Sequence, residues 1–343
     1  MTRTSVLPAE GFLLEYAPGR LVVGSGPLDR GDRRPRGALA CYAPDFFLGD
    51  ERPWLRPAAW HETTRAALRD ALDGLQPPGV DWDEPNPAGY AARFAALMDR
   101  IQAGTLDKAV PVILERGTWQ GPADDAVQGL VRRALEASGP SFVYAAWTAT
   151  AGMVGASPEV LFVREAPDRV DSVAMAGTCP DARVADLACD PKEAREHESV
   201  VDDIVTALRT MGTVSVGARE IVRLPGMAHL KTDIAVAVTA PVDFDTIVRA
   251  LHPTAALGVA PRSAGADLLA SLGPGDRGRF GAPFGIEWPD GRAHVLVAIR
   301  NVQWTGRAVT LGAGAGVIAE SRLEREWEEL RLKRTAVKDM LGL

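Results

Sequence analysis

A predicted helix near the end of the chain carries charged side chains on the face that should be buried. The apolar, Gly-rich run 311–319 leads to Ser321, and Glu324 follows three residues later, which is the pattern of an N-cap with its capping box. One face of the predicted helix consists of Glu326, Leu330, Lys333, Val337 and Met340, with Glu329 at its border. Because a solvated helix directs its charges away from its apolar stripe, this segment predicts carboxylates and an ammonium that face the protein interior.

A second segment, 190–208, repeats this unusual pattern. Glu193 lies on the edge of its apolar stripe and Glu196 lies just beyond. The stripe itself consists of His197, Val201, Ile204, Val205 and Leu208. Buried charges cost several kcal/mol each unless they are paired or bound to an ion. Two helices that each direct an E-x-x-E pair towards a shared interior therefore predict an all-oxygen site for a hard cation such as Mg²⁺. The alternative is two ordinary amphipathic helices with ion pairs at their surface.

Charge and cysteine content restrict the possible partners and the compartment. The net charge is −7, and the basic cluster 30–36 is interrupted by an acidic residue, a proline and glycines, so no nucleic-acid partner is expected. Cys41, Cys179 and Cys189 show no metal-ligand spacing and cannot all pair, which fits a reducing compartment. The sequence shows neither a signal-peptide pattern nor an apolar run of membrane-spanning length. We therefore expect a cytoplasmic protein without a membrane partner.

The predicted strands and helices are grouped rather than alternating. Helices are expected at roughly 58–74, 90–101, 124–137, 244–251 and 263–271, in addition to the two acidic helices. Near the end, the segments 280–288, 294–304 and 308–317 read as strands joined by two tight turns. This arrangement indicates an α+β fold with antiparallel strands. We expect a single domain over residues 1–343, with a variable N-terminal part over 1–85, made of edge strands and loops, and a core over 86–343.

Eight short motifs occur in the order found in one enzyme family. They are Gly155-Ala-Ser-Pro-Glu159, Met175-Ala-Gly-Thr178, Lys192-Glu-x-x-Glu-His197, His229-Leu, Leu251-His-Pro-Thr254, Val297-Ala-Ile-Arg300, Ala313-Gly-Ala-Gly316 and Glu326-Trp-x-Glu329 with Lys333. Together they cover about residues 90–340. The chain resembles the chorismate-utilising enzymes, which include isochorismate synthase, salicylate synthase and the synthase components of anthranilate and aminodeoxychorismate formation. The resemblance implies a large antiparallel sheet sandwich flanked by helices, with 86–343 as a chorismate-binding catalytic core.

The resemblance also implies a Mg²⁺ ion and assigns its ligands. Glu196 and Glu329 would hold the ion, with Glu193 and Glu326 in its shell, and the ion would bind the ring carboxylate of chorismate. Arg300 and Lys333 would meet the enolpyruvyl carboxylate, helped by the backbone around Gly314. The remaining substrate-binding residues that the motifs imply are Gly177, Thr178, His229, His252 and Thr254.

Two residues match the family's acid and base. Glu159 corresponds to the general acid that protonates the leaving C4 hydroxyl, and its site should raise its pKa. Lys108 corresponds to the lysine that activates water in isochorismate and salicylate synthases. It must lose its proton to do so, which a desolvated lysine can. Without the surrounding motifs, the simpler interpretations are a turn residue for Glu159 and a surface lysine at a strand end for Lys108.

The residues at two positions distinguish the branches of the family. Members that use ammonia resemble anthranilate synthase and carry glutamine where this chain has Lys108. The aminodeoxychorismate type carries a nucleophilic lysine where this chain has Ala176. Water is therefore the expected nucleophile. His252 and Leu257 resemble the isochorismate type, whereas salicylate synthases tend to carry Phe and Thr there, so we expect isochorismate as the product.

Three departures from the family pattern accompany these matches. Ile113 replaces a usual Arg, Ala282 lies in an altered Tyr-Ala-Gly-Pro run, and His294 replaces a Glu. They leave a salicylate synthase and a non-catalytic homologue open as alternatives. We expect a monomer without a glutaminase subunit.

Overall fold

Two large antiparallel sheets form the framework of the protein. The computed structural model describes residues 6–121, 126–187, 189–224, 226–273 and 277–343. The first sheet has the order β6 (Ala59–Thr64), β2 (Arg20–Ser25), β1 (Gly11–Ala17), β10 (Phe142–Trp147), β11 (Ala151–Ser157), β19 (Asn301–Thr305), β20 (Ala308–Gly314), β9 (Val112–Trp119) and β7 (Val80–Asp83). Each neighbouring pair is antiparallel, as the grouped strand patterns predicted.

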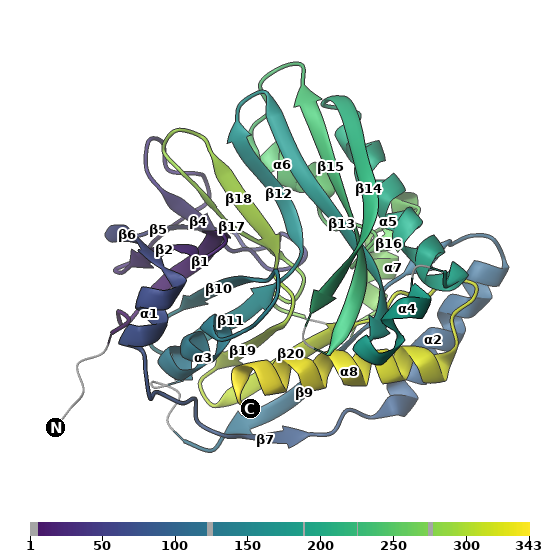
Figure 1. Ribbon diagram of the computed structural model, residues 1–343, viewed down its shortest axis with the longest axis horizontal. Helices are drawn as coiled ribbons and strands as arrows, with labels where there is room; N and C mark the ends of the chain where they lie inside the picture. Colours follow the sequence, from purple (N-terminus) through teal and green to yellow (C-terminus); the bar gives the residue numbers. More distant parts are fainter. Residues whose placement is uncertain (1–5, 122–125, 188, 225, 274–276) are drawn as a thin grey trace.

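The second sheet lies above the first in Figure 1. Its order is β14 (Gly212–Leu224), β15 (Met227–Val238), β13 (Arg169–Pro180), β12 (Val160–Ala166), β18 (Ala293–Val297), β17 (Pro283–Glu287), β4 (Ala40–Tyr42), β5 (Trp54–Arg56) and β3 (Asp29–Gly31). A separate short pair joins β8 (Lys108–Ala109) to β16 (Val259–Ala260). The fold is therefore α+β with an antiparallel sandwich, as expected.

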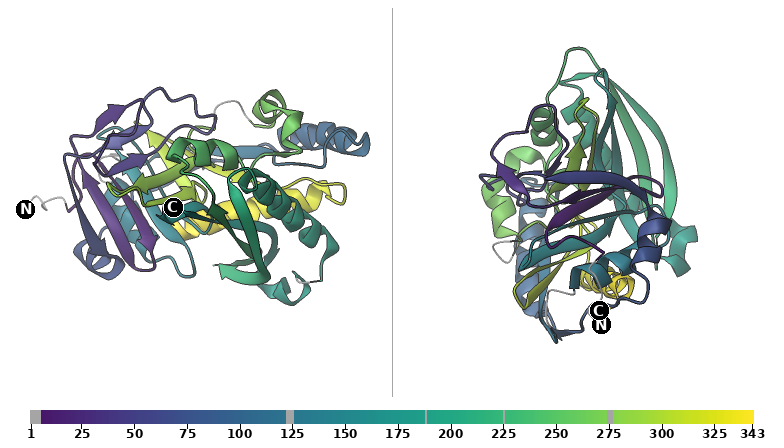
Figure 2. Two further views of the ribbon diagram at one scale, coloured as in Figure 1. Left: turned by 90° about the horizontal axis from the view of Figure 1, so that it is seen from above. Right: turned by 90° about the vertical axis from the view of Figure 1, so that its left-hand side faces the viewer.

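The helices cover the outer faces of the two sheets (Figures 1 and 2). They are α1 (Arg65–Ala71), α2 (Pro87–Gln102), α3 (Ala126–Leu135), α4 (Val184–Leu187), α5 (Pro191–Leu208), α6 (Phe244–Leu251), α7 (Ala266–Ser271) and α8 (Leu323–Leu341), with short 3₁₀ turns at 181–183 and 262–264. The two acidic helices of the sequence are α5 and α8. Helix α5 packs on β13 and β15, and α8 packs on β20 and α3.

The core divides along these layers. Phe12, Tyr144 and Phe284 belong to a cluster between the two sheets. A larger cluster lies between the second sheet and the helices α5 and α6, and a third lies between the first sheet and α1, α3 and the end of α8. Helix α8 is also fixed by a buried ion pair, in which Arg334 Nη1 lies 2.6 Å from Glu115 Oε2 on β9. The acidic end of α8 is thereby held at a fixed place beside β20.

Two strand crossings from one sheet to the other lie side by side at the centre of the molecule. Strand β11 of the first sheet continues into β12 of the second through residues 158–159, and β18 returns to β19 through residues 298–300. The Val297 N–H donates to the Glu159 carbonyl at 3.0 Å, and the Ala156 N–H donates to the Arg300 carbonyl at 3.3 Å. The crossings therefore bring Glu159 and Arg300 to the same bend.

Three local predictions were wrong, the first two because strand pairing overrides the local pattern and the third because a nearby backbone N–H occupies the expected cap. The predicted helix 58–74 is instead strand β6 followed by α1, since 59–64 pair with β2; His61 is thus exposed on a strand rather than on a helix. The predicted strand 294–304 divides into β18 and β19 at the crossing. Ser321 is not the N-cap of α8. The N-cap is Arg322, without a side-chain bond, and the Ser321 hydroxyl accepts from the Ile318 N–H at 3.1 Å.

The N-terminal residues are more central than predicted. Strands β1 and β2 lie inside the first sheet, and β1 pairs directly with β10 of the core. Apart from the residues left undescribed, the structure contains no helix whose length and apolarity would suffice to cross a membrane.

Candidate functional site

An inner cavity of about 70 Å³ lies where the two strand crossings meet α5 and α8. Its polar lining comprises Glu159, Thr178, Glu196, His229, Arg300 and Lys333. Its remaining wall is made of small and apolar residues, including Ala176, Leu257 and Phe280 and the backbone of the glycine-rich run after β20. With Gly177 included, seven of the fourteen residues for which the sequence predicted a role therefore face one cavity, although they come from six different parts of the chain.

Glu159 occupies the first strand crossing and is held without a carboxylate hydrogen bond among the described contacts. Its backbone N–H donates to the Ser157 hydroxyl at 3.2 Å, and that hydroxyl donates to the Val297 carbonyl at 2.7 Å. The side chain is buried, and this burial raises the pKa of Glu159 to about 7 against the opposing effect of Lys108, Lys333 and Arg300. A carboxyl in this state can donate a proton near neutral pH.

Arg300 occupies the second crossing with a strained backbone. Its φ of 58° lies in the left-handed region, which a non-glycine residue adopts only when its surroundings impose it. Its guanidinium donates to His229 Nε2 at 3.1 Å. Because arginine can only donate, His229 Nε2 must accept, and its Nδ1–H then donates to the Thr178 hydroxyl at 3.0 Å. Burial lowers the pKa of His229 well below its usual value, which agrees with this neutral tautomer.

The guanidinium of Arg300 makes no ion pair with any carboxylate of the described residues. Burial lowers its pKa to about 10, so it keeps its charge at neutral pH. A buried cation without a protein counter-ion favours an anionic ligand.

Lys108 lies directly behind the wall of this cavity. Its side chain is fully buried, and its Nζ lies 3.2 Å from Glu196 Oε1. Gly316 lies on the cavity wall beside Glu196 and in front of Lys108. A Cβ atom on Gly316 would lie 2.1 Å from Glu196 Oε1 and 2.9 Å from Lys108 Cε, so only glycine fits here. The glycine-rich run after β20 thus has a steric role, in addition to the backbone role that the resemblance assigned to Gly314.

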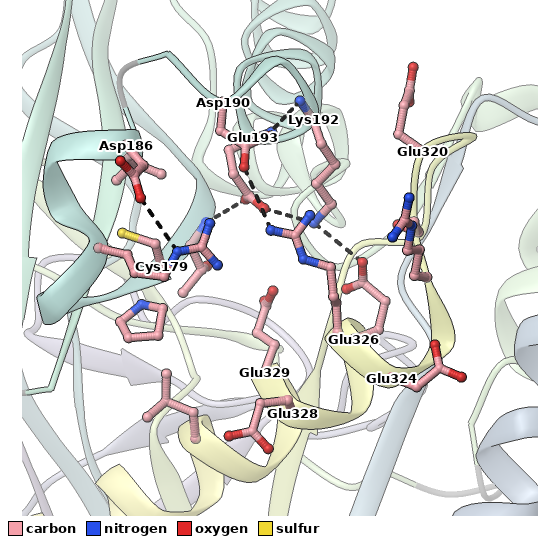
Figure 3. A pocket seen from close by; sticks show the side chains of 18 residues that line it. Cys179, Asp186, Asp190, Lys192, Glu193, Glu320, Glu324, Glu326, Glu328 and Glu329 are labelled. Atoms are coloured by element: carbon pink, nitrogen blue, oxygen red, sulfur yellow. Dashed lines mark hydrogen bonds and ion pairs between the residues drawn. The ribbon is translucent and has the colours of Figure 1, made fainter.

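Four glutamates from α5 and α8 converge between the helices, as Figure 3 shows for three of them. Glu193, Glu196 and Glu326 are buried, and the side chain of Glu329 is 12% exposed. The prediction that these carboxylates face the interior is confirmed. Burial and mutual repulsion raise the pKa of Glu326 to about 7, and burial raises that of Glu193 to about 7. Burial opposes the ionisation of Glu196 as well, but Lys192 and Lys108 lower its pKa to about 2.

The ammonium of Lys192 lies inside this carboxylate cluster. Its Nζ is 3.0 Å from Glu196 Oε2, 3.2 Å from Glu193 Oε1 and 3.4 Å from Glu326 Oε1. Lys192 belongs to one of the family motifs, but no role for it was predicted. The signal was available, because a lysine four residues before a glutamate on a predicted helix contacts it across one turn.

The cluster fits a hard divalent cation in the chemistry of its donors. All the donors are carboxylate oxygens, and Glu326 Oε2 is buried without a hydrogen-bond partner. Nevertheless, within the described ranges no three His, Cys, Asp or Glu side chains are arranged as a metal-binding group. Lys192 lies between the carboxylates that would have to approach one another.

The second predicted cation, Lys333, is also paired with a cluster member. Its Nζ lies 2.6 Å from Glu329 Oε1 and donates to the Gly314 carbonyl at 2.8 Å. Lys333 therefore lies between the inner cavity and the cluster, on the side of α8.

An outer cavity of about 290 Å³ lies on the other side of the carboxylate cluster, between α4, the start of α5 and the start of α8. It shares Thr178 with the inner cavity. Gly177 makes this junction possible: its φ of 76° forms a bulge in β13, and the Thr178 N–H then donates to Glu193 Oε2 at 2.7 Å. A Cβ on Gly177 would lie 2.8 Å from the Glu193 carbonyl.

Three predicted site residues lie behind the cavity rather than on its wall. His252 Nε2 lies 2.7 Å from the Phe46 carbonyl, and the Thr254 hydroxyl accepts from the Ala256 N–H at 3.3 Å. Both therefore support the loop that carries Leu257 to the cavity. Gly314 uses its carbonyl for Lys333. His197, interpreted from the sequence as a packing residue, is buried, and its Nε2 lies 2.8 Å from the Thr232 hydroxyl.

Comparison with known proteins gives consistent similarities. Residues 59–342 match the chorismate binding enzyme family. The chain is 33% identical over 286 residues to a Mycobacterium tuberculosis protein named provisionally as isochorismate synthase MenF, covering 76% of this chain and 74% of that protein. It is 28% identical over 335 residues to isochorismate synthase EntC of Escherichia coli, covering 94% and 81%. The structure of the menaquinone-specific isochorismate synthase MenF of Escherichia coli superposes with a TM-score of 0.83 at 21% identity, over 98% of this chain and 90% of the other.

Proposed function

Because this chain belongs to the chorismate-binding enzyme family, we propose that it is a Mg²⁺-dependent isochorismate synthase. In this reaction the oxygen of water forms a bond to ring carbon C2 of chorismate, the ring double bonds shift, and the C4 hydroxyl leaves as water. One water is consumed and one is released, so atoms and charge balance. The catalyst must remove a proton from the attacking water, protonate the leaving hydroxyl and hold a dianionic substrate.

The charges around the inner cavity support a dianionic substrate. Arg300 has no carboxylate partner among the described residues, and its guanidinium geometry suits a carboxylate. Lys333 adds a second cation on the same wall. The hydrogen bond from Arg300 to His229, continued to Thr178, fixes the direction of the guanidinium and so would orient the substrate. We propose that this pair receives the enolpyruvyl carboxylate.

The observation that carries the proposal is a buried carboxyl with a pKa raised to about 7 on the wall of one cavity, with a buried amine directly behind that wall. Lys108, on the short strand β8, has the largest opposing effect on the raised pKa of Glu159, which lies at the first strand crossing. We assign Lys108 as the base that accepts a proton from water, and Glu159 as the acid that protonates the leaving hydroxyl. An ammonia-using enzyme would have no use for a buried base at the position of Lys108.

Glu196 and Glu329 would hold Mg²⁺, with Glu193 and Glu326 next to it, in agreement with their donor chemistry. When bound, the ion would neutralise the ring carboxylate and stabilise the electron density that it receives. The inner cavity of about 70 Å³ is smaller than typical ligand pockets. We therefore propose that substrate and ion together use the space on both sides of the carboxylate cluster.

One incubation tests the proposed reaction. Purified protein with chorismate and Mg²⁺ is expected to form isochorismate as its only product. At equilibrium the amounts of chorismate and isochorismate should be nearly equal, because the bonds made and broken are alike. The products are separated by liquid chromatography, with a chelator-treated sample as the control. Salicylate together with pyruvate would instead indicate a salicylate synthase, and unchanged chorismate would indicate a non-catalytic homologue. Approach to the same mixture from isochorismate would establish reversibility.

Gly316→Ala is expected to reduce kcat/KM about 10²-fold while the protein still folds. The added methyl group would displace Glu196 and Lys108, since its Cβ would lie 2.1 Å from the Glu196 carboxylate oxygen. We expect a stability loss on the order of 1–3 kcal/mol, measured by urea unfolding. Gly89→Ala is the matched control, because its Cβ would meet only Arg93 at 3.9 Å on α2 and should not affect activity. Full activity of the Gly316 variant would contradict the assigned positions of both groups.

A further inference from the structure

Lys192 has a position that the proposed reaction does not explain. It occupies the first turn of α5, directly after Pro191, and it is 7% exposed. Its ammonium contacts Glu193 and Glu196 of its own helix and Glu326 of α8. A lysine buried this deeply usually pairs with one carboxylate, whereas this one lies among three.

Each of the other two lysines near the cluster contacts a single carboxylate. Lys108 pairs with the inner oxygen of Glu196, and Lys333 pairs with Glu329. The central position, equally near oxygens of both helices, belongs to the ammonium of Lys192. The geometry of the cluster therefore depends on one cation that bridges α5 and α8 at ammonium distances of 3.0–3.4 Å.

We propose that Lys192 is a displaceable counter-ion, whose ammonium occupies the position of the divalent cation and leaves it when that cation binds. This inference rests on the Mg²⁺ assignment in the proposed function. Lys192 lies closest to Glu196, which the proposed function assigns to Mg²⁺, and it also contacts Glu193 and Glu326, which would lie next to the ion. Mg²⁺ binds its oxygen ligands at about 2.0–2.1 Å, so the ion and the ammonium would compete for Glu196. Their like charges also repel at this separation. Metal binding and the departure of Lys192 are then one coupled exchange, which keeps the cluster neutralised in both states.

The outer cavity offers the destination for the displaced side chain. Lys192 already lines this space of about 290 Å³, which carries both acidic and basic side chains. The acidic ones at the start of α8 are Glu320, Glu324 and Glu328, and the other basic ones are Arg183, Arg322 and Arg325. Figure 3 shows Glu320 and Glu324 near the start of α8, on the same side as the Lys192 side chain. A released ammonium can therefore stay near carboxylates while it enters solvent. The exchange requires a change in the Lys192 rotamer rather than movement of a helix.

Removal of the competing charge should strengthen metal binding. Lys192→Met keeps the length and apolar stem of the side chain, and we expect it to bind Mg²⁺ at least tenfold more tightly than the wild type. The measurement is titration calorimetry of the full-length protein with Mg²⁺ alone. Without Mg²⁺, we expect Lys192→Met to have a lower melting temperature than the wild type, since three carboxylates lose the ammonium between them. With Mg²⁺ bound, the two melting temperatures should be similar. Equal or weaker Mg²⁺ binding by the variant would overturn the proposal.

Arg195→Gln is the matched control. Arg195 lies on the same helix, three residues later, and pairs with Glu320 at the surface. Its substitution also removes one positive charge near the cluster, so it measures the general electrostatic effect. We expect at most a twofold change in Mg²⁺ affinity for this variant. A tenfold gain in both variants would assign the effect to overall charge and would overturn the specific role of Lys192.

A second measurement uses the wild-type protein and does not depend on the folding of a variant. Brief acetylation with acetic anhydride, followed by peptide mass spectrometry, reports the accessibility of Lys192 with and without Mg²⁺. We expect modification of Lys192 to increase several-fold with Mg²⁺, while Lys231, a partly exposed lysine on β15, stays unchanged as the internal reference. Unchanged or reduced modification would overturn the proposal.

The outcomes separate this inference from the proposed function. If the wild type converts chorismate with Mg²⁺ but Lys192→Met binds the ion no more tightly, the proposed exchange is wrong and the proposed function stands. Wild-type protein that binds no Mg²⁺ and converts no chorismate would overturn both.

Discussion

Lys108→Gln is expected to lose about 10²–10⁴-fold in kcat, with no ammonia-dependent activity gained in exchange. Lys108 is fully buried, and its amine is held between Glu196 and the cavity wall at Gly316. Glutamine has no group that can accept a proton from water. The rate of isochorismate formation at saturating chorismate and Mg²⁺ is the measurement, and KM should change much less than kcat because Lys108 does not line the cavity.

Lys108→Arg separates loss of the base from loss of the ion pair with Glu196. Arginine keeps a positive charge opposite Glu196 but does not give up its proton at any usable pH. We therefore expect Lys108→Arg to be as inactive as Lys108→Gln, while its melting temperature lies closer to that of the wild type. Lys231→Gln on the exposed side of β15 should leave both quantities unchanged. If Lys108→Gln keeps more than a tenth of the wild-type rate, another group must activate the water.

The acidic helices could be predicted from the sequence because the relevant information is local. A period of 3.6 residues places Glu326, Leu330 and Val337 on one face, and all three are buried in the structure. Lys333 and Met340 of the predicted face are only half-buried, and the neighbouring Arg334 and Leu341 are buried instead. The same argument placed Glu193 at the edge of the stripe of α5, where it is buried. The exact partner of each carboxylate is a different matter. The i,i+4 spacing predicts the contact of Lys192 with Glu196, but nothing local predicts its contact with Glu326 of α8.

The strand crossings could not be predicted, since they depend on pairing between distant segments. The run 294–304 has the composition of one strand, yet β18 pairs with β12 and β17, whereas β19 pairs with β11 and β20. The break between them places Arg300 in the left-handed region, at the bend that also holds Glu159. Sequence similarity identified both residues, but their joint position follows from the two sheets.

The same distinction applies to residues that matched family motifs without reaching the cavity. His252 and Thr254 form hydrogen bonds that shape the loop before Leu257. The motif 251–254 therefore supports the cavity wall at Leu257 without itself lining the cavity. The three departures from the family pattern are all buried. Ile113 lies on β9, where it pairs with Ala313 of β20, and Ala282 lies just before β17. His294 lies on β18 beside Phe142. None of the three lines the inner cavity, and the charges that we assign to catalysis remain in place.

Glu159→Gln is expected to lose about 10²–10⁴-fold in kcat and yet to be more stable than the wild type above pH 7. Burial raises the pKa of Glu159 from its usual value of 4.5 to about 7. Between these values the folded protein retains a proton that the unfolded chain releases, so wild-type stability falls as the pH rises through this window. Glutamine carries no such proton and mimics the protonated carboxyl. The wild type therefore bears a penalty on the order of 3 kcal/mol, nearly complete at pH 8, that the variant does not have.

The comparison is made by urea unfolding of both proteins at pH 5 and pH 8. We expect the advantage of Glu159→Gln to be small at pH 5 and to reach its full size at pH 8, and wild-type kcat/KM to decline above about pH 7 as the acid ionises. Glu62 is an exposed residue of β6 that pairs with Arg20 of β2. Glu62→Gln should change neither the pH dependence of stability nor the pH dependence of kcat/KM. An inactive Glu159→Gln without a pH-dependent gain in stability would mean that the carboxyl is ionised in the folded protein. It then could not serve as the proton donor, and the acid of the reaction would have to lie elsewhere.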